Sequence, residues 1–280
     1  MTASEQRPRG PWDPAPEAAP PAAPARPSTR GPALDAGQSP GWAIASTLLL
    51  AAFLWWIMGS WVFAAAGIFG VLVHEYGHVL AMNRLGMGPA RIYIIPFLGG
   101  AARAQRPAAS EWHGVLVSLA GPAFGLLAMG PFVLAWVLTG EAVWLQGALF
   151  IAFINLINLA PAPPLDGSHA LGPVLARIDP VLEKAALVCI GALAVWWGVS
   201  NGSYIFAAFL AIAVLGHLRR GAWRATTRPL SWSQAGRSLG LYLLTAAVCA
   251  AAGVAALLPL AGGSLPEAIR VGLGFLEFGR

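Results

Sequence analysis

The most regular feature of this chain is a series of long apolar runs, several of them 16 or more residues in length. Such runs are typical of transmembrane helices, because a helix needs about 20 apolar residues to cross a hydrocarbon core about 30 Å thick. We count seven, at residues 41–58, 61–82, 112–138, 143–159, 185–199, 204–218 and 239–260. The pattern predicts an all-α polytopic membrane protein, a bundle of about seven transmembrane helices. The fifth and sixth runs are short for the core, which favours little tilt or local thinning of the bilayer.

Composition supports the same class of protein. The 280 residues are 57% hydrophobic and 10% charged, against about 25% charged residues in soluble domains. The net charge of +5 comes from basic residues in short loops between apolar runs, so we interpret it as a topology signal and expect no nucleic-acid partner. Cys189 and Cys249 lie inside apolar runs, where packing rather than a disulfide is indicated.

The two ends of the chain differ from its apolar centre. Residues 1–40 hold ten of the 23 prolines, with Ala, Gly and Ser, a composition that predicts a disordered cytoplasmic extension. This extension is either an inert tail or a docking segment for a partner. Residues 41–260 are expected to form the transmembrane bundle, and residues 261–280 a C-terminal tail.

The basic residues predict the orientation of the spans. With seven spans, 15 of the 17 Lys and Arg residues fall on the side of the N-terminus. Only Arg270 and Arg280 fall on the other side, in the tail. By the positive-inside rule, the N-terminus is cytoplasmic and the C-terminus lies outside. We therefore expect a multi-pass protein of the cell membrane.

The candidate chemistry begins with the motif His74-Glu75-Tyr-Gly-His78, inside the second apolar run. On a helix, residues four apart share one face, so His74 and His78 can bind one metal ion. Glu75 lies at the edge of that face, where it can act as a base on a water molecule at the metal. Charged residues in a membrane span cost roughly 2.5–3.5 kcal/mol each on insertion scales, which favours a functional role. The alternative is a pair of hydrogen-bonded histidines in a bundle core.

The loop between the second and third runs contains an apolar, β-rich stretch at residues 91–100. It is too short to span as a helix, and Pro96 and the Gly99-Gly100 pair would break one. It is either a plain amphiphilic loop or a short re-entrant β-like loop that dips into the membrane beside the metal site. Non-helical backbone at that depth requires surrounding protein or a wet cavity.

A second motif ends the fourth run: Asn155 and Asn158 are followed by three prolines, then Asp166 and Gly167. The prolines unwind the helix end and free Asp166 to point into the bundle. On the predicted topology Asp166 lies at the cytoplasmic side, like the histidines, and can complete a His₂-carboxylate zinc site with an open position. The alternative is a capping aspartate, with His169 or His217 as the third ligand.

Together, these two motifs resemble the site-2 protease family of intramembrane zinc metalloproteases, over residues 61–172. The resemblance implies one Zn²⁺ per chain held by His74, His78 and Asp166, with Glu75 activating water. It implies hydrolysis of a peptide bond within or next to the transmembrane segment of a membrane-bound protein, as in regulated intramembrane proteolysis. It also implies a membrane-dipping β element before the third core helix, which residues 91–100 resemble.

The chain departs from the family pattern at one position. The family often has Gly-Pro-x-x-Asn in its third core helix, where this chain has Gly121-Pro122 followed by Gly125. Asn155 or Asn158 is a candidate for the role of that asparagine. We predict that these two asparagines, with Gly99 and Gly100, position the substrate. The chain also carries no inserted PDZ module.

Two other functions remain open from the sequence. A metal-binding or metal-transport protein would also place histidines and a carboxylate in the membrane, although these groups cluster at one depth. A non-cleaving relative would bind transmembrane helices without hydrolysis, although the intact Glu75 argues against it. The sequence defines neither the substrate nor the oligomeric state.

Overall fold

A computed structural model describes residues 35–97, 99–202, 204–219 and 228–276. The chain divides into two units, residues 1–35 and 36–280, and the described residues belong almost entirely to the second. Most of the predicted disordered extension, residues 1–40, lies outside the described residues, so that expectation stays a prediction.

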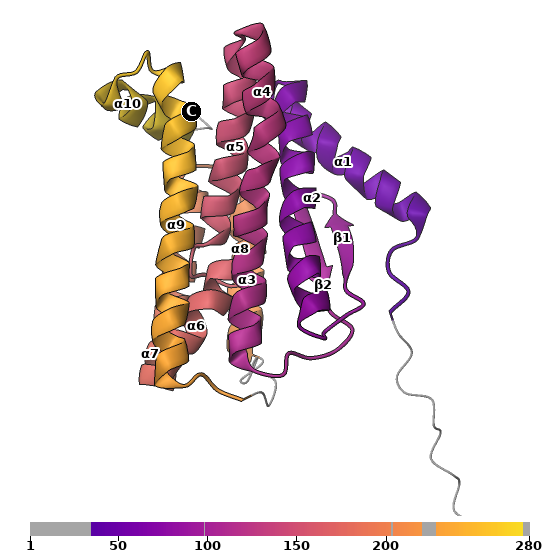
Figure 1. The fold of residues 1–280 in the computed structure, drawn as a ribbon, viewed down its shortest axis with the longest axis vertical. Coiled ribbons are helices and arrows are strands. Elements are labelled where there is room, and N and C mark those ends of the chain that lie inside the picture. Colours follow the sequence, from indigo (N-terminus) through magenta and orange to yellow (C-terminus); the bar gives the residue numbers. More distant parts are fainter. Residues whose placement is uncertain (1–34, 98, 203, 220–227, 277–280) are drawn as a thin grey trace, which may run out of the picture. The chain divides into compact units, whose positions relative to one another are not determined.

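Each of the seven apolar runs contains a helix, which confirms the mostly helical architecture (Figure 1). The helices are α1 (Pro40–Met58), α2 (Trp61–Arg84), α3 (Glu111–Gly125), η1 (Leu126–Ala128), α4 (Met129–Thr139), α5 (Ala142–Asn158), α6 (Asp166–Ile178), α7 (Pro180–Ser200), α8 (Tyr204–Arg219), α9 (Trp232–Leu260) and α10 (Leu265–Leu276).

Five helices of the described chain are long and apolar enough to cross a membrane: α1, α2, the continuous α3–α4 segment, α7 and α9. Helix α5 is apolar but shorter, at 17 residues, and α8 has 16. The count of about seven spans therefore stays a prediction for these two helices.

Helix caps account for the boundaries that the apolar pattern misplaced. Helix α7 was expected to be short, but it has 21 residues because Asp179 caps it and Pro180 opens it. Helix α9 starts several residues before its apolar run, at a capping box between Ser231 and Gln234. Polar residues in the first turns of both helices hid these starts from a search for apolar runs.

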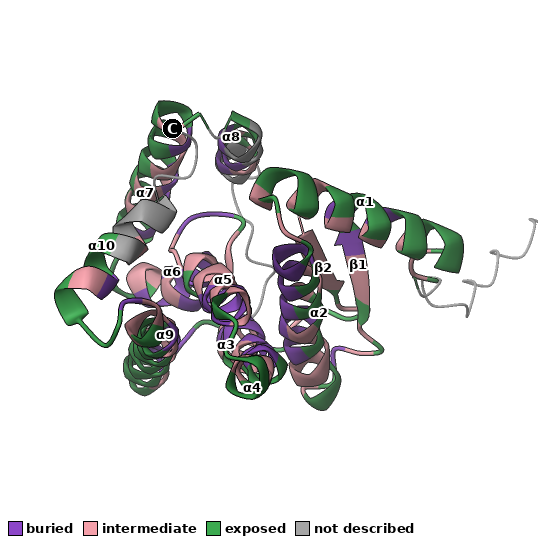
Figure 2. Cartoon of the chain, turned by 90° about the horizontal axis from the view of Figure 1, so that it is seen from above, coloured by how far each residue is buried: buried purple, intermediate pink, exposed green. Residues whose placement is uncertain are grey.

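The core lies where α2, α3 and α5 pack together, and Figure 2 shows the buried residues gathered on these helices. One cluster joins α2 to α4 and α5 through fully or nearly fully buried side chains such as Val62, Phe132 and Ile151. Helices α1 and α9 bury only a small share of their surface. Helix α2, which carries the first motif, and α5, in which the second begins, thus belong to the buried centre of the bundle together with α3.

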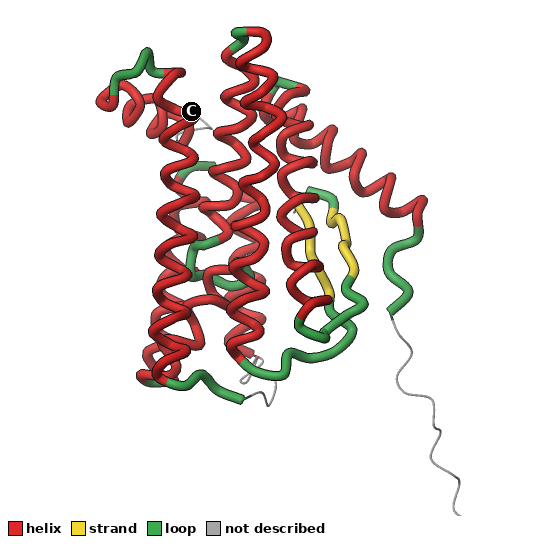
Figure 3. The backbone as a smooth tube through the Cα atoms, in the orientation of Figure 1, coloured by secondary structure: helices red, strands yellow, loops and turns green. Residues whose placement is uncertain are grey.

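A two-stranded antiparallel hairpin follows α2 and lies beside it (Figure 3). Strand β1 is Arg91–Ile95 and strand β2 is Gly99–Arg103, with Ile94 opposite Gly100. Its strands begin where the β-rich stretch was predicted, although β2 extends three residues beyond it. That the hairpin dips into the membrane stays a prediction.

Candidate metal centre

His74 and His78 lie one turn apart on α2, both with less than 7% of their surface exposed, and their Nε2 atoms are 3.1 Å apart. The other ring nitrogens have partners: Nδ1 of His78 is 2.8 Å from the carbonyl oxygen of Val117, and Nδ1 of His74 is 2.9 Å from Oδ1 of Asn155. Both partners accept hydrogen bonds, so each Nδ1 donates and each neutral ring keeps a lone pair on Nε2. Two potential ligand atoms thus face the same space.

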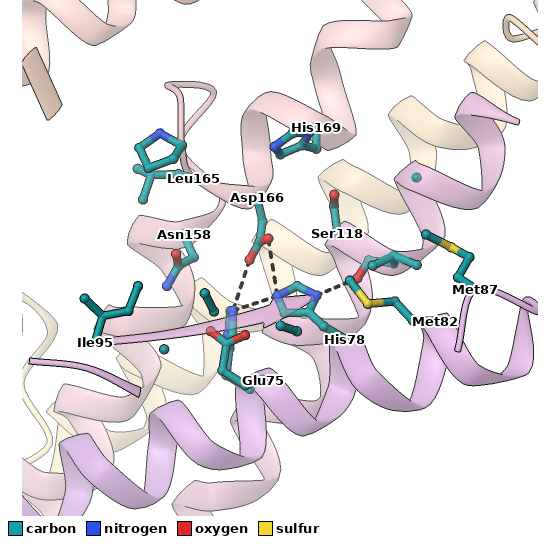
Figure 4. A pocket seen from close by; sticks show the side chains of 17 residues that line it. Glu75, His78, Met82, Met87, Ile95, Ser118, Asn158, Leu165, Asp166 and His169 are labelled. Carbon is teal, nitrogen blue, oxygen red and sulfur yellow. Dashed lines mark hydrogen bonds and ion pairs between the residues drawn. The ribbon is translucent and has the colours of Figure 1, made fainter. Parts of the chain in front are cut away.

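Asp166 enters this space from the first residue of α6. Its Oδ2 lies 3.0 Å from Nε2 of His74, and its Oδ1 lies 3.3 Å from Nε2 of His78 (Figure 4). The chain reaches this position because α5 ends at Asn158 and the proline-rich turn leads directly into α6. The structure therefore brings together three predicted ligands from two distant segments.

Gly167 permits the close packing of this turn. A Cβ atom at this position would lie closer than 3.0 Å to the carbonyl groups of Leu159 and Ala160. The carbonyl oxygen of Leu159 also accepts a hydrogen bond from the hydroxyl of Tyr242 on α9, at 2.8 Å. The end of α5 and the start of α6 are thus held against each other beside the cluster.

The cluster has the chemistry of a metal site. The ligand atoms of His74, His78 and Asp166 all lie within 4.8 Å of one another, the one such group in the described chain. Nitrogen lone pairs and a carboxylate repel at this distance unless a cation or proton lies among them. Two imidazoles and one carboxylate form a ligand set used by catalytic zinc, with a fourth position open for water or substrate. The residues present fit a zinc ion.

Glu75 lies beside the cluster without being part of it. Its side chain is buried, and its Oε2 has no hydrogen-bond partner. Strand β2 packs directly over it, because a Cβ at Gly100 would lie 2.5 Å from Cγ of Glu75. A buried carboxylate oxygen without a donor is costly, and the Glu75 side chain that carries it lines a cavity beside the cluster.

The cavity has a volume of about 490 Å³ and lies between α2, β2, α3 and the start of α6 (Figure 4). Among the predicted substrate-positioning residues, Asn158 and Gly100 line it, whereas Asn155 and Gly99 do not. His169 also lines the cavity but is not one of the three clustered groups. The side chain of His217 lies outside the described part of the chain.

Sequence reasoning missed two contributions of α3. In the sequence, Gly121 stands out only as part of the Gly-Pro pattern of the third core helix, but a Cβ at Gly121 would lie closer than 3.0 Å to Nε2 of both His74 and His78. This glycine therefore makes room for the imidazoles themselves. The Val117 carbonyl that fixes His78 gives no sequence signal, because every residue has a carbonyl group.

Comparison with protein families gives a match over the part of the chain that carries the first motif. Residues 62–147 match peptidase family M50. This result confirms the resemblance to the site-2 protease family. The matched stretch contains His74, Glu75 and His78 but ends before Asp166, so the third side chain of the cluster comes from outside the M50 match.

The chain is also similar to one curated protein whose name describes a metalloprotease. The chain is 29% identical over 159 residues to a protein of Synechocystis sp. named "Putative zinc metalloprotease sll0528". The alignment covers 53% of this chain and 40% of the relative, so the chain spans less than half of that protein's length. No solved structure gives a significant match.

Proposed function

We propose that this chain is an intramembrane zinc metalloprotease that hydrolyses a peptide bond within or next to the transmembrane segment of a membrane-bound protein. The observation that carries the proposal is the convergence of His74, His78 and Asp166 beside Glu75, whose Oε2 has no hydrogen-bond partner, at a cavity among apolar helices. The match to peptidase family M50 supports the same reaction.

His74, His78 and Asp166 would hold one zinc ion per chain. The ion would supply a Lewis acid that activates a water molecule and polarises the peptide carbonyl. Glu75 is the general base of the proposal: its free Oε2 takes a proton from the attacking water and returns it to the leaving amine. Glu75 is buried beneath β2, where the backbone of Ala102 donates a hydrogen bond to its carboxylate while Oε2 accepts none.

The edge of β2 provides a place for an extended substrate. Gln38 covers the far edge of the hairpin, because its Nε2 donates to the carbonyl oxygen of Ile94 at 2.8 Å and its Oε1 accepts from the Ile94 N–H at 3.0 Å. These backbone groups point away from β2. Ile94 and Gly100 lie opposite each other in the antiparallel ladder. When the N–H and C=O groups of Ile94 point away from β2, those of Gly100 point away from β1. Gly100 lines the cavity, so a substrate strand can pair there.

The substrate must unwind to use this edge, because a transmembrane helix satisfies its peptide groups within itself. Asn158, which lines the cavity with its Nδ2 bonded to the carbonyl oxygen of Ile154, is our candidate for contacting the unwound segment. The partners of the proposal are a membrane-spanning protein and the lipid bilayer. Residues 41–260 form the protease bundle, flanked by the extension of residues 1–40 and the tail of residues 261–280.

The decisive experiment is cleavage of a tethered single-span reporter by wild type, Glu75→Gln and wild type with a zinc chelator. Glu75→Gln keeps the size and removes the base, so cleavage should fall by roughly 10²–10⁴-fold while zinc content is unchanged. Glu141→Gln, which changes an exposed carboxylate at the start of α5, is the matched control and should cleave normally.

The same experiment separates the other functions. Wild-type cleavage by Glu75→Gln would overturn the mechanism. A non-cleaving helix binder would retain the reporter equally with Glu or Gln, and a metal transporter would move zinc into vesicles without any link to peptide cleavage.

A further inference from the structure

Asn155 is fully buried on α5, behind His74 as seen from the cavity. Its Nδ2 donates to the carbonyl oxygen of Ile151 at 2.8 Å, which fixes the orientation of the amide. The oxygen is thereby left facing Nδ1 of His74, at 2.9 Å. Asn155 thus touches a candidate ligand and does not touch the space where substrate would lie.

The two histidines are held in different ways. His78 donates to a backbone carbonyl, that of Val117, which no side-chain substitution removes. His74 donates to a side chain. The partner of a ligand's second nitrogen fixes the tautomer and the ring orientation, and its loss typically costs 10–100-fold in metal affinity or activity. A substitution at Asn155 can therefore remove the hydrogen-bond acceptor of His74, whereas no side-chain substitution removes that of His78.

Gly125, at the end of α3, is the structural counterpart of Asn155. A Cβ atom at Gly125 would lie closer than 3.0 Å to Oδ1, Cγ and Nδ2 of Asn155. The space behind His74 consequently holds one side chain, either from position 125 or from position 155. In this chain the glycine leaves the space to the asparagine of α5.

We propose that Asn155 is a positioning residue that orients His74 for metal binding, and that Gly125 and Asn155 form an interdependent pair. This chain departs from the Gly-Pro-x-x-Asn pattern at position 125, and an amide from the neighbouring helix fills the space instead. The inference rests on the proposed function in that His74 is taken as a zinc ligand. It changes the predicted role of Asn155 from positioning substrate to positioning a ligand.

The first test compares Asn155→Leu with wild type in the full-length, purified chain. Leucine keeps the approximate size and removes the acceptor. Zinc affinity, measured by competition with a chelator, should fall about 10–100-fold, and the absorption spectrum of the cobalt-substituted protein should change. For the reporter, kcat should fall with KM unchanged, because Asn155 does not line the cavity. Wild-type zinc affinity and cobalt spectrum in Asn155→Leu would overturn the proposal.

The second test moves the side-chain amide from position 155 to position 125. Gly125→Ala should weaken zinc binding by crowding Asn155, whereas Gly130→Ala, whose Cβ would meet no atom within 4 Å, is the matched control. Gly125→Asn combined with Asn155→Gly should recover zinc affinity relative to Asn155→Gly alone. A double variant no better than the single one would contradict the interdependence of the two positions.

A His74→Ala background separates this inference from the proposed function. His74→Ala should lose the bound zinc on purification, so the residual affinity of this background is measured by titration with added zinc. If Asn155 acts through His74, Asn155→Leu should not lower that residual affinity further. Full zinc binding by His74→Ala would instead refute the metal site itself. An additive further loss would mean that Asn155 supports the fold rather than His74, and thermal unfolding of the metal-free variants would show the same destabilisation.

Discussion

At the scale of single residues, the candidate site depends on glycines, which have no side chain, as much as on the polar side chains packed against them. A Cβ at Gly121 would meet both imidazoles, and one at Gly125 would meet Asn155. A Cβ at Gly100 would meet Glu75. The polar groups can be buried at these positions because the neighbouring elements carry no side chain there. Small residues in these helices thus act on the chemistry directly.

Gly121→Ala should therefore disrupt the cluster without changing any polar group. The added methyl group must displace at least one imidazole, and we expect zinc affinity and reporter cleavage to fall by about 10–100-fold, as when a ligand loses its orientation. Gly236→Ala, on an open surface of α9, serves as the control. Equal zinc affinity in the two variants would contradict the packing described here.

The ligand assignment makes a prediction for metal content. Wild type should contain one zinc per chain by elemental analysis, and His74→Ala, His78→Ala and Asp166→Ala should each lose it, because removing one of three ligands leaves too few donors. His113→Ala, outside the cluster, should keep it. If Asp166→Ala retained full zinc and activity, Asp166 would be a helix cap and His169, on the same cavity, the next candidate.

At the scale of elements, the site is assembled where α5 ends and α6 begins. Helix α9 supports this junction through the hydrogen bond from Tyr242 to the carbonyl oxygen of Leu159. Helix α6 was not expected from the apolar pattern, because it is short and carries polar residues in its first turn. Its first residue is Asp166, so the packing of α6 decides where that carboxylate points.

Tyr242→Phe should loosen this junction. The change leaves the Leu159 carbonyl without its hydroxyl donor, and we expect a loss of about 1 kcal/mol in the free energy of unfolding. Thermal unfolding of the protein in detergent measures this effect, with Tyr204→Phe as a control because that tyrosine is 67% exposed. Equal stability of the two variants would show that the hydrogen bond contributes nothing.

At the scale of the whole described bundle, the chain alternates direction between two ends. Figure 1 shows the α4–α5 connection and α10 at one end, and the α6–α7 connection and the start of α9 at the other. The second end is the one that carries most basic residues in the predicted topology. The cytoplasmic N-terminus and the external C-terminus stay predictions of the basic-residue distribution.

Reporter fusions test this topology. Fusions after Arg30, Arg228 and Arg280 should report cytoplasmic, cytoplasmic and external positions, because the positive-inside rule retains the basic loops in the cytoplasm. A cytoplasmic C-terminus would mean that one predicted span does not cross. The shorter helices α5 and α8 would then be the first to reconsider.

The sequence by itself determined the features that depend on local periodicity. Apolar runs located the long apolar helices but not α6 or α10, since crossing a membrane requires a continuous run of known length. The spacing of His74 and His78 placed them on one face, because helix geometry alone fixes residues four apart. The motif also predicted Asp166 as the third ligand. Its position beside the two histidines, however, depends on the packing of the start of α6 against α2, which are distant in the sequence.

Only the tertiary structure separated Asn155 from Asn158. Three residues apart on α5, they lie on nearly the same face, and the sequence pattern treats them alike. They differ by about 4.5 Å along the helix axis, which puts Asn155 against His74 and Asn158 at the cavity. That depth depends on how α5 packs against α2 and α3, and no local pattern encodes it.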